Sequence, residues 1–416
     1  MGKSSIIYVM GLSMIVSLAL LNMNSSTTDA VQNFSTYYSR TVAHNIAVSG
    51  ANIGCGDVFR DSNYATPYAN IDFLGGKMNI TFTVTGNQKF VTAVGAIDIG
   101  SIHVRDTIIA QLRNQSLARY AWFTNFEANR GGQPTSWSTG DTAFGPAHTN
   151  DKFNINGSPA FMKKATAWQS AVPKKNDAVW AGGYEWGLKI PYPDNLTPFM
   201  TAATDPVNGR SVVNKDAIIE FNPSGSIRLQ VPTAGYDSTF PNADAFAKNG
   251  AFAVVGGNLT VHGTVVGDLA IGAVTTPLMG GGNVYVSGDI RYKTDPRVFP
   301  TSTDQLVMYA ENDITVTYDH LNPALYYDRQ IDASIFSLKG EFNVEDYKTD
   351  PPRGTLQTFG AMMQYYRGGV GDINPGNGTL KSGYYKGFHF DERLTKKPPK
   401  YYPATGRYLL YSWREN

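Results

Sequence analysis

In the segment Gly267-Asp268-Leu269-Ala270-Ile271 a turn residue precedes a strand-like run. It returns as GDIRY at 288–292, NDITV at 312–316 and GEFNV at 340–344, and in a weaker form as GAMMQ at 360–364. The Gly or Asn that opens each copy suits a tight turn. The residues that follow alternate with the period of a β-strand. Repeats of this size are typical of stacked supersecondary units.

The repeat predicts a mainly β protein whose body is an irregular β-solenoid, or β-helix. Its core is expected to contain the residue that follows the polar position in each copy, namely Leu269, Ile290, Ile314 and Phe342. The alternative is a β-sandwich whose hairpins begin alike, because sandwiches also show short strands separated by regular turn signals.

Composition supports β structure and argues against some partners. Only 17% of the residues are charged, whereas the chain has 42 Gly and 24 Tyr, and the net charge of +1 gives no electrostatic case for a nucleic-acid partner. Cys55 is the single cysteine, so an intrachain disulfide is excluded.

The N-terminus reads as a membrane segment. Lys3 is followed by an apolar run, and no charged residue occurs until Asp29. A helix of roughly 17–25 apolar residues spans a bilayer. The positive-inside rule then places the N-terminus in the cytoplasm and the body outside. A cleaved signal peptide has the same order of charge and apolar residues, and both interpretations export the protein.

The helical pattern continues past the apolar run, so we predict one helix from about Ser4 to about Asn52, ended by Gly50, Gly54 and Gly56. Its apolar positions are expected to form an assembly surface with the membrane or with other helices. The residues of this surface are Ile6, Val9, Leu12, Ile15, Leu18, Phe34, Tyr38, Val42 and Ile46.

Four segments are expected along the chain. Residues 1–56 form the helix, and residues 57–130 form a small meander with strands at 78–85, 90–95 and 104–112 and a short helix at 116–125. Residues 131–382 form the solenoid body, with a short helix near 195–203. Residues 383–416, rich in Tyr and Pro, are expected to stay extended and to cap the last coil.

Several stretches carry a resemblance to a known family: YAWFTN at 120–125, FGPAHTN at 144–150, INGSPAF at 155–161, GYYK at 383–386 and YYP at 401–403. With these, the chain resembles bacterial envelope proteins that have a long pilin-like N-terminal helix and a domain of unknown function. Such proteins are often associated with type IV pilus or type II secretion-like machinery. The resemblance covers nearly the whole chain and implies self-association or assembly with homologous pilin helices.

One position departs from the pilin pattern. Type IV prepilins are cut after a Gly and usually carry Glu as the fifth mature residue, but the fifth residue after Gly2 is Ile7. That Glu normally pairs with a neighbouring subunit's amine inside an apolar filament core, where an unpaired charge is costly. The departure favours a minor, tip-located or merely anchored role over that of a major pilin.

No motif for catalysis, a metal or a cofactor is found. His148, with Asp141, Asn150 and Asp151 nearby, is expected to satisfy backbone groups. Glu311-Asn312-Asp313 and Glu345-Asp346 are expected to be solvated turns, because no twelve-residue Ca²⁺ loop surrounds them. The sequence therefore predicts a non-enzymatic structural protein of the cell envelope, without cofactor or metal.

The alternative is a secreted or surface solenoid that binds or cleaves polysaccharide. It requires a row of exposed aromatic side chains or a carboxylate cluster on one face. The candidate row is Tyr292, Tyr309, Tyr318 and Tyr365.

Overall fold

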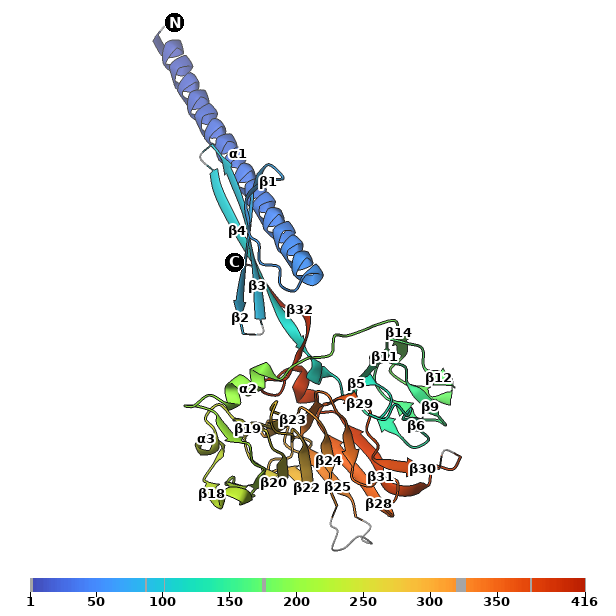
Figure 1. The fold of residues 1–416 in the computed structure, drawn as a ribbon. Coiled ribbons are helices and arrows are strands. Elements are labelled where there is room, and N and C mark those ends of the chain that lie inside the picture. The colour runs from blue at the N-terminus through green and yellow to red at the C-terminus, as the bar shows by residue number, and fades with distance from the viewer. Residues whose placement is uncertain are drawn as a thin grey trace. The chain divides into compact units, whose positions relative to one another are not determined.

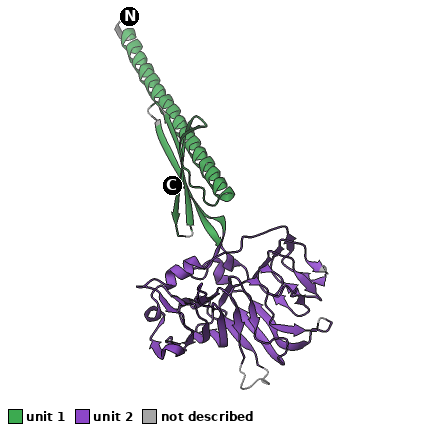
Figure 2. Ribbon diagram, in the orientation of Figure 1, with its two compact units in different colours: residues 1–115, 406–416 green, residues 116–405 purple. Residues whose placement is uncertain are grey.

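The protein is described by a computed structural model that covers residues 3–86, 88–100, 102–173, 177–318, 327–374 and 376–415. Internal contacts divide the chain into two units (Figure 2), residues 1–115 with 406–416, and residues 116–405. The second unit is thus an insertion in the sequence of the first. This division differs from the four consecutive segments expected from the sequence.

Unit 1 is a long helix on a five-stranded antiparallel sheet (Figure 1). The strands lie in the order β1-β2-β3-β4-β32, and β1 to β4 form a meander. The bounds are α1 Lys3–Arg60, β1 Tyr68–Phe73, β2 Gly76–Thr85, β3 Gln88–Ile99, β4 Ile102–Ser116 and β32 Ala404–Glu415. The three expected strands are present in β2, β3 and β4.

The glycines expected to end the helix lie inside it. A Cβ on Gly54 would approach Val91 Cγ1 to 2.5 Å, and one on Gly95 of β3 would approach the Ala43 carbonyl oxygen to 2.0 Å. Glycine at such positions lets two backbones come close together. These glycines therefore bring α1 against the sheet, and tertiary packing overrides their weak helix propensity.

The C-terminal segment is not the extended cap that was expected. Its last part is β32, which lies next to β4 in unit 1. Ser412 Oγ donates to Gln111 Oε1 of β4 at 2.9 Å. The side chains of Tyr408 and Trp413 pack against the core of unit 1.

Unit 2 is built mainly from parallel strands. One sheet has ten strands, which in spatial order are β14 Tyr184–Trp186, β11 Ala165–Ala167, β8 Ala147–Thr149, β5 Trp122–Phe126, β29 Met362–Tyr366, β26 Ser334–Ser337, β23 Gln305–Ala310, β21 Asp268–Val274, β19 Ala251–Val255 and β15 Arg210–Val213. Every adjacent pair in it is parallel.

A second sheet has fourteen strands and follows the same succession. Its main path is β13 Val179–Trp180, β10 Ala160–Phe161, β7 Thr142–Ala143, β31 Leu380–His389, β28 Pro352–Phe359, β25 Arg329–Asp332, β22 Val284–Tyr292, β20 Leu259–Val265, β16 Ala217–Phe221, β17 Ile227–Val231 and β18 Tyr236–Phe240. Off this path lie β24 Ile314–Val316, β27 Phe342–Val344 and β30 Gly371–Ile373. A third sheet joins β12 Val172–Pro173, β9 Asn154–Asn156 and β6 Trp137–Ser138.

The strand order shows an unusual path through unit 2. The chain starts in the middle of the ten-stranded sheet at β5 and moves outward through β8 and β11 to β14. It resumes at the opposite edge with β15 and returns strand by strand to β29, which pairs with β5. The first and last strands of this sheet, in chain order, are therefore neighbours. This parallel pairing is not what hairpins of the sandwich alternative would give.

The four repeat residues are buried, but they are not equivalent. Ile314 and Phe342 are direct partners on β24 and β27. Leu269 lies in the ten-stranded sheet and pairs with Leu306, and Ile290 pairs with Ile331. All four are therefore core residues, as expected, but they do not form one stack, because the signature recurs on strands of two different sheets.

The outer face of the ten-stranded sheet is covered by two segments without strands. Phe199 of α2 Thr197–Ala203 lies 4.5 Å from the Tyr309 ring, measured between centroids. Tyr402 donates from its hydroxyl to the Ile335 carbonyl at 3.0 Å. This explains why β21, β23 and β26 are buried on both faces. The Tyr-rich tail thus covers a sheet face and does not cap the end of a coil.

The remaining short helices are η1 Leu117–Arg119, η3 Pro232–Ala234, α3 Ala243–Phe246 and η4 Glu392–Thr395. The helix expected near 195–203 is confirmed by α2. The helix expected at 116–125 is wrong beyond η1. Its aromatic second half, Trp122 to Phe126, forms β5, where bulky side chains fill the core between parallel neighbours.

Candidate functional site: the exposed half of the N-terminal helix

Helix α1 has two halves in different surroundings. Ile15 is 65% exposed and Phe34 is 70% exposed, whereas Ile46 is fully buried against the sheet. In Figure 1 the N-terminal half of α1 extends beyond the strands of its own unit. By length and composition the helix can cross a membrane, and none of its most apolar window is buried within the protein. An exposed apolar surface of this size calls for a partner.

The hydroxyl side chains in this half bond within the helix. Ser13 Oγ donates to the Met10 carbonyl at 2.9 Å, and Thr27 Oγ1 donates to the Met23 carbonyl at 2.7 Å. Thr28 donates in the same way to Asn24 at 2.8 Å. A polar group that already has a partner costs less to remove from water. These serine and threonine residues are therefore compatible with an apolar environment.

The structure separates the expected assembly surface into two parts. Ile6, Val9, Leu12, Ile15, Leu18, Phe34 and Tyr38 are exposed. Val42 is half-buried and Ile46 is fully buried, since both belong to the part of α1 that packs on the sheet. The apolar stripe is continuous in sequence, but its last members are used inside unit 1.

His148 is enclosed by polar and aromatic neighbours. Its Nδ1 lies 2.8 Å from Thr166 Oγ1 and its Nε2 lies 3.1 Å from Asn150 Oδ1. The ring stacks on Phe123 at 4.9 Å. In the described part of the chain, no group of three or more His, Cys, Asp or Glu side chains could hold a metal ion.

The acidic turn at 311–313 is partly buried, not fully solvated as expected, and its carboxylates form ion pairs with other segments. Glu311 pairs with Lys339 at 2.6 Å, and Asp313 pairs with Arg130 at 2.7 Å. Burial raises the pKa of Asp313, whereas the ammonium of Lys339 and the Thr275 donors lower the pKa of Glu311 despite its burial.

The tyrosines considered as an exposed row do not form one. Tyr292 and Tyr309 are buried, and Tyr318 and Tyr365 are only partly exposed. Desolvation raises the pKa of Tyr309 well above its usual value. Tyr292 belongs to the main core of unit 2, and the Tyr309 ring packs against Phe199 of α2.

Two buried polar clusters in unit 2 escaped the sequence analysis. In the first, the carboxylate of Glu127 accepts from Trp137 Nε1 at 3.1 Å and from Trp122 Nε1 at 3.3 Å. It also accepts from Thr124 and pairs with the Arg367 guanidinium. Glu127 directly follows β5 and Arg367 directly follows β29. The ion pair therefore links the ends of the two neighbouring strands at which the chain enters and leaves the ten-stranded sheet.

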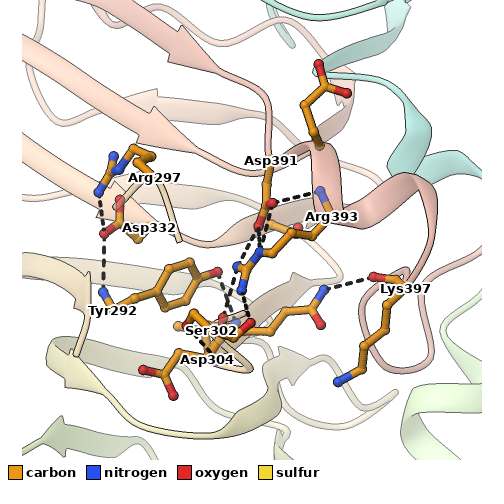
Figure 3. A network of polar contacts seen from close by, with 12 residues as sticks. Tyr292, Arg297, Ser302, Asp304, Asp332, Asp391, Arg393 and Lys397 are labelled. Atoms are coloured by element: carbon orange, nitrogen blue, oxygen red, sulfur yellow. Dashed lines mark hydrogen bonds and ion pairs between the residues drawn. The ribbon is translucent and has the colours of Figure 1, made fainter. Parts of the chain in front are cut away.

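The second cluster joins the segment that follows β31 to the loop before β23 (Figure 3). Arg393 donates to the carbonyls of Ser302 at 2.7 Å and Asp304 at 3.0 Å, and pairs with Asp391 at 2.7 Å. Asp332 accepts from the Tyr292 backbone and pairs with Arg297 at 3.1 Å. Burial raises the pKa of Asp332 above its usual value. No local pattern marks these partners, because they lie on segments distant in sequence.

Comparisons with known proteins add two findings. A family model described as "Domain of unknown function (DUF4900)" matches residues 77–169. The crystal structure of competence-associated pilin ComZ from Thermus thermophilus is similar over 91% of this chain and 97% of that chain, with 11% identity and a TM-score of 0.33. That TM-score is too low to establish a common fold. No curated protein matches the sequence.

Proposed function

We propose that this chain is a non-enzymatic, pilin-like component of the bacterial cell envelope, held by the exposed half of α1. The observation that carries the proposal is the uncharged, outward-facing run from Ile6 to Met23. Burying such side chains stabilises by about 1.5–3 kcal/mol each. The run is therefore a strong drive toward a bilayer or a bundle of like helices. The single-pass orientation places the body outside the cytoplasm.

Unit 1 fits this role because the same helix continues onto an antiparallel sheet without interruption. An anchor joined rigidly to a folded unit transmits position and orientation to it. We also propose that the parallel sheets of unit 2 are faces of one β-solenoid displayed by unit 1. The matching succession of the ten- and fourteen-stranded sheets supports this. Of the two features on which the polysaccharide alternative could rest, the exposed tyrosine row is not formed.

Membrane fractionation of cells tests the anchor. Ile15→Asp places a carboxylate in the middle of the apolar run, at a cost of about 3 kcal/mol for membrane insertion. We expect this variant to move from the alkali-washed membrane fraction to the soluble or degraded fraction. Gln32→Glu, exposed on the same helix beyond the run, is the matched control and should stay in the membrane. Recovery of the unmodified chain in the soluble fraction with its N-terminus intact would contradict the proposal.

Cysteine crosslinking tests assembly with a second copy. Phe34→Cys lies on the exposed apolar face, whereas Asp72→Cys lies on the exposed strand β1. If helices of neighbouring copies pack together, oxidation should produce dimers from Phe34→Cys and few from Asp72→Cys. The native Cys55 is buried and should contribute little. Equal yields from both positions would favour an anchored monomer.

A further inference from the structure

Unit 2 contains a polar pocket that the proposed function does not use. Its volume is about 420 Å³, within the range of sites for small ligands. The segment after β5, the turn before β28 and the strands β30 and β31 line it. It therefore lies beside the segments that follow β5 and β29, the neighbouring strands at which the chain enters and leaves the ten-stranded sheet.

A buried lysine forms part of the lining. The side chain of Lys386 is 7% exposed, and its Nζ lies 2.7 Å from Asp141 Oδ2. Asp141 is itself buried, and its second carboxylate oxygen has no hydrogen-bond partner in the described part of the chain. Desolvation lowers the pKa of Lys386. A buried lysine with an acidic partner and a lowered pKa at a pocket wall is a candidate mark of a functional site.

Two exposed lysines stand at the same pocket with loosely held partners. Lys381 Nζ lies 3.8 Å from Asp372 Oδ2, and Lys348 Nζ lies 3.5 Å from Gln133 Oε1. Both distances are long for a direct hydrogen bond. These ammonium groups can therefore turn toward an anion at little cost.

The rest of the lining offers hydrogen bonds and one aromatic face. Amide and hydroxyl groups come from Asn129, Gln133, Thr135, Ser136, Ser138 and Asn156. Tyr347 lies against Gly369, where a Cβ would approach the ring to 2.1 Å. A tyrosine side chain among many hydrogen-bonding groups suits a molecule with both C–H groups and hydroxyls.

We propose that this pocket binds a carboxylate-bearing saccharide, with Lys348 and Lys381 facing the carboxylate. The described lining residues include no arginine, the side chain best suited to clamp a phosphate. Two of the three lysines have an acidic neighbour, which favours a single negative charge over the double charge of a phosphate. The hydroxyl and amide groups then hold the sugar ring.

Calorimetric titration of the full chain in detergent tests the assignment. The probes are a disaccharide of one galacturonic acid and one galactose, which carries a single carboxylate, the neutral digalactose and inorganic phosphate. We expect binding of the uronic acid only, weakened by added salt. Lys348→Gln with Lys381→Gln should weaken it by about tenfold or more, as for the loss of charge-assisted contacts.

Lys293→Gln is the matched control, because Lys293 is exposed and lies outside the pocket lining. It should leave the affinity unchanged. Equal binding of digalactose, tighter binding of phosphate, no binding of the uronic acid, or an unchanged affinity in the double variant would each overturn the assignment. Unfolding temperatures equal to that of the parent chain would establish that the variants are folded.

Discussion

Replacing Glu127 by Leu should destabilise unit 2 strongly. Glu127 and Arg367 have side chains that are 0% exposed, and the carboxylate also accepts from two indole N–H groups. Removing one partner of a buried ion pair costs about 3–5 kcal/mol, because the other charge is left uncompensated. With the two indoles also losing their acceptor, we expect about 4 kcal/mol or more. At roughly 2 °C per kcal/mol for a unit of this size, the unfolding temperature should fall by about 8 °C.

A double variant separates the cost of the unpaired charge from the loss of the ion pair itself. Glu127→Leu combined with Arg367→Met removes both charges, so the double variant should lose only about 2 kcal/mol, less than the first variant alone. Thermal unfolding of the full chain in detergent, followed by near-ultraviolet circular dichroism, measures the parent chain, the two single variants Glu127→Leu and Arg367→Met, and the double variant. Glu185→Gln, which breaks the exposed pair with Lys164, should change stability by less than about 1 kcal/mol. If the separate effects of Glu127→Leu and Arg367→Met on the free energy of unfolding sum to the effect of the double variant within about 0.5 kcal/mol, the two charges do not interact and the reasoning fails.

Three other predictions concern packing and pH. Gly54→Ala should destabilise unit 1 by about 1–3 kcal/mol, because the added Cβ clashes with Val91. Gly56→Ala, which has open space around it, should stabilise unit 1 by about 0.5–1 kcal/mol. Denaturant unfolding of the two variants measures both effects. Ile314→Asp should cost several kcal/mol because it buries a carboxylate without a partner, and an unchanged unfolding temperature would contradict this. Because burial raises the folded-state pKa of Asp332, its contribution to the free energy of unfolding is complete below about pH 4, where the carboxyl is protonated in both states, and is lost as pH rises through the folded-state pKa. Asp332→Asn should therefore flatten the pH dependence of the free energy of unfolding in this range, as measured by urea titrations at successive pH values.

The sequence predicted the features that depend on neighbouring residues. The apolar run, the helix that follows it and the strands at 78–85, 90–95 and 104–112 all carry a local period, and the structure has them. The end of α1 was predicted wrongly because Gly50, Gly54 and Gly56 look like a stop signal in isolation. Gly50 and Gly54 are favourable inside that helix because they lie close against the sheet, whereas Gly56 has open space around it.

The features that escaped prediction depend on residues far apart in the chain. The pairing of β5 with β29 and of β4 with β32 leaves no periodic trace. The same holds for the Glu127–Arg367 pair, whose members are 240 positions apart. The pocket at this junction was missed for that reason, since its lysines come from a turn and a strand that are unremarkable in sequence.

The insertion of unit 2 follows from where its ends lie. The Leu117 backbone N–H donates to the Pro403 carbonyl at 2.9 Å, so the first and last residues of the unit are side by side. In unit 1, the strands that lead to these ends, β4 and β32, are also neighbours. A chain can be interrupted between adjacent strands with little cost in loop-closure entropy when the inserted unit returns close to its start. Beginning in the middle of its sheets, at β5 beside β29, gives unit 2 this property: a stack of strands followed from one end to the other would leave its two ends far apart.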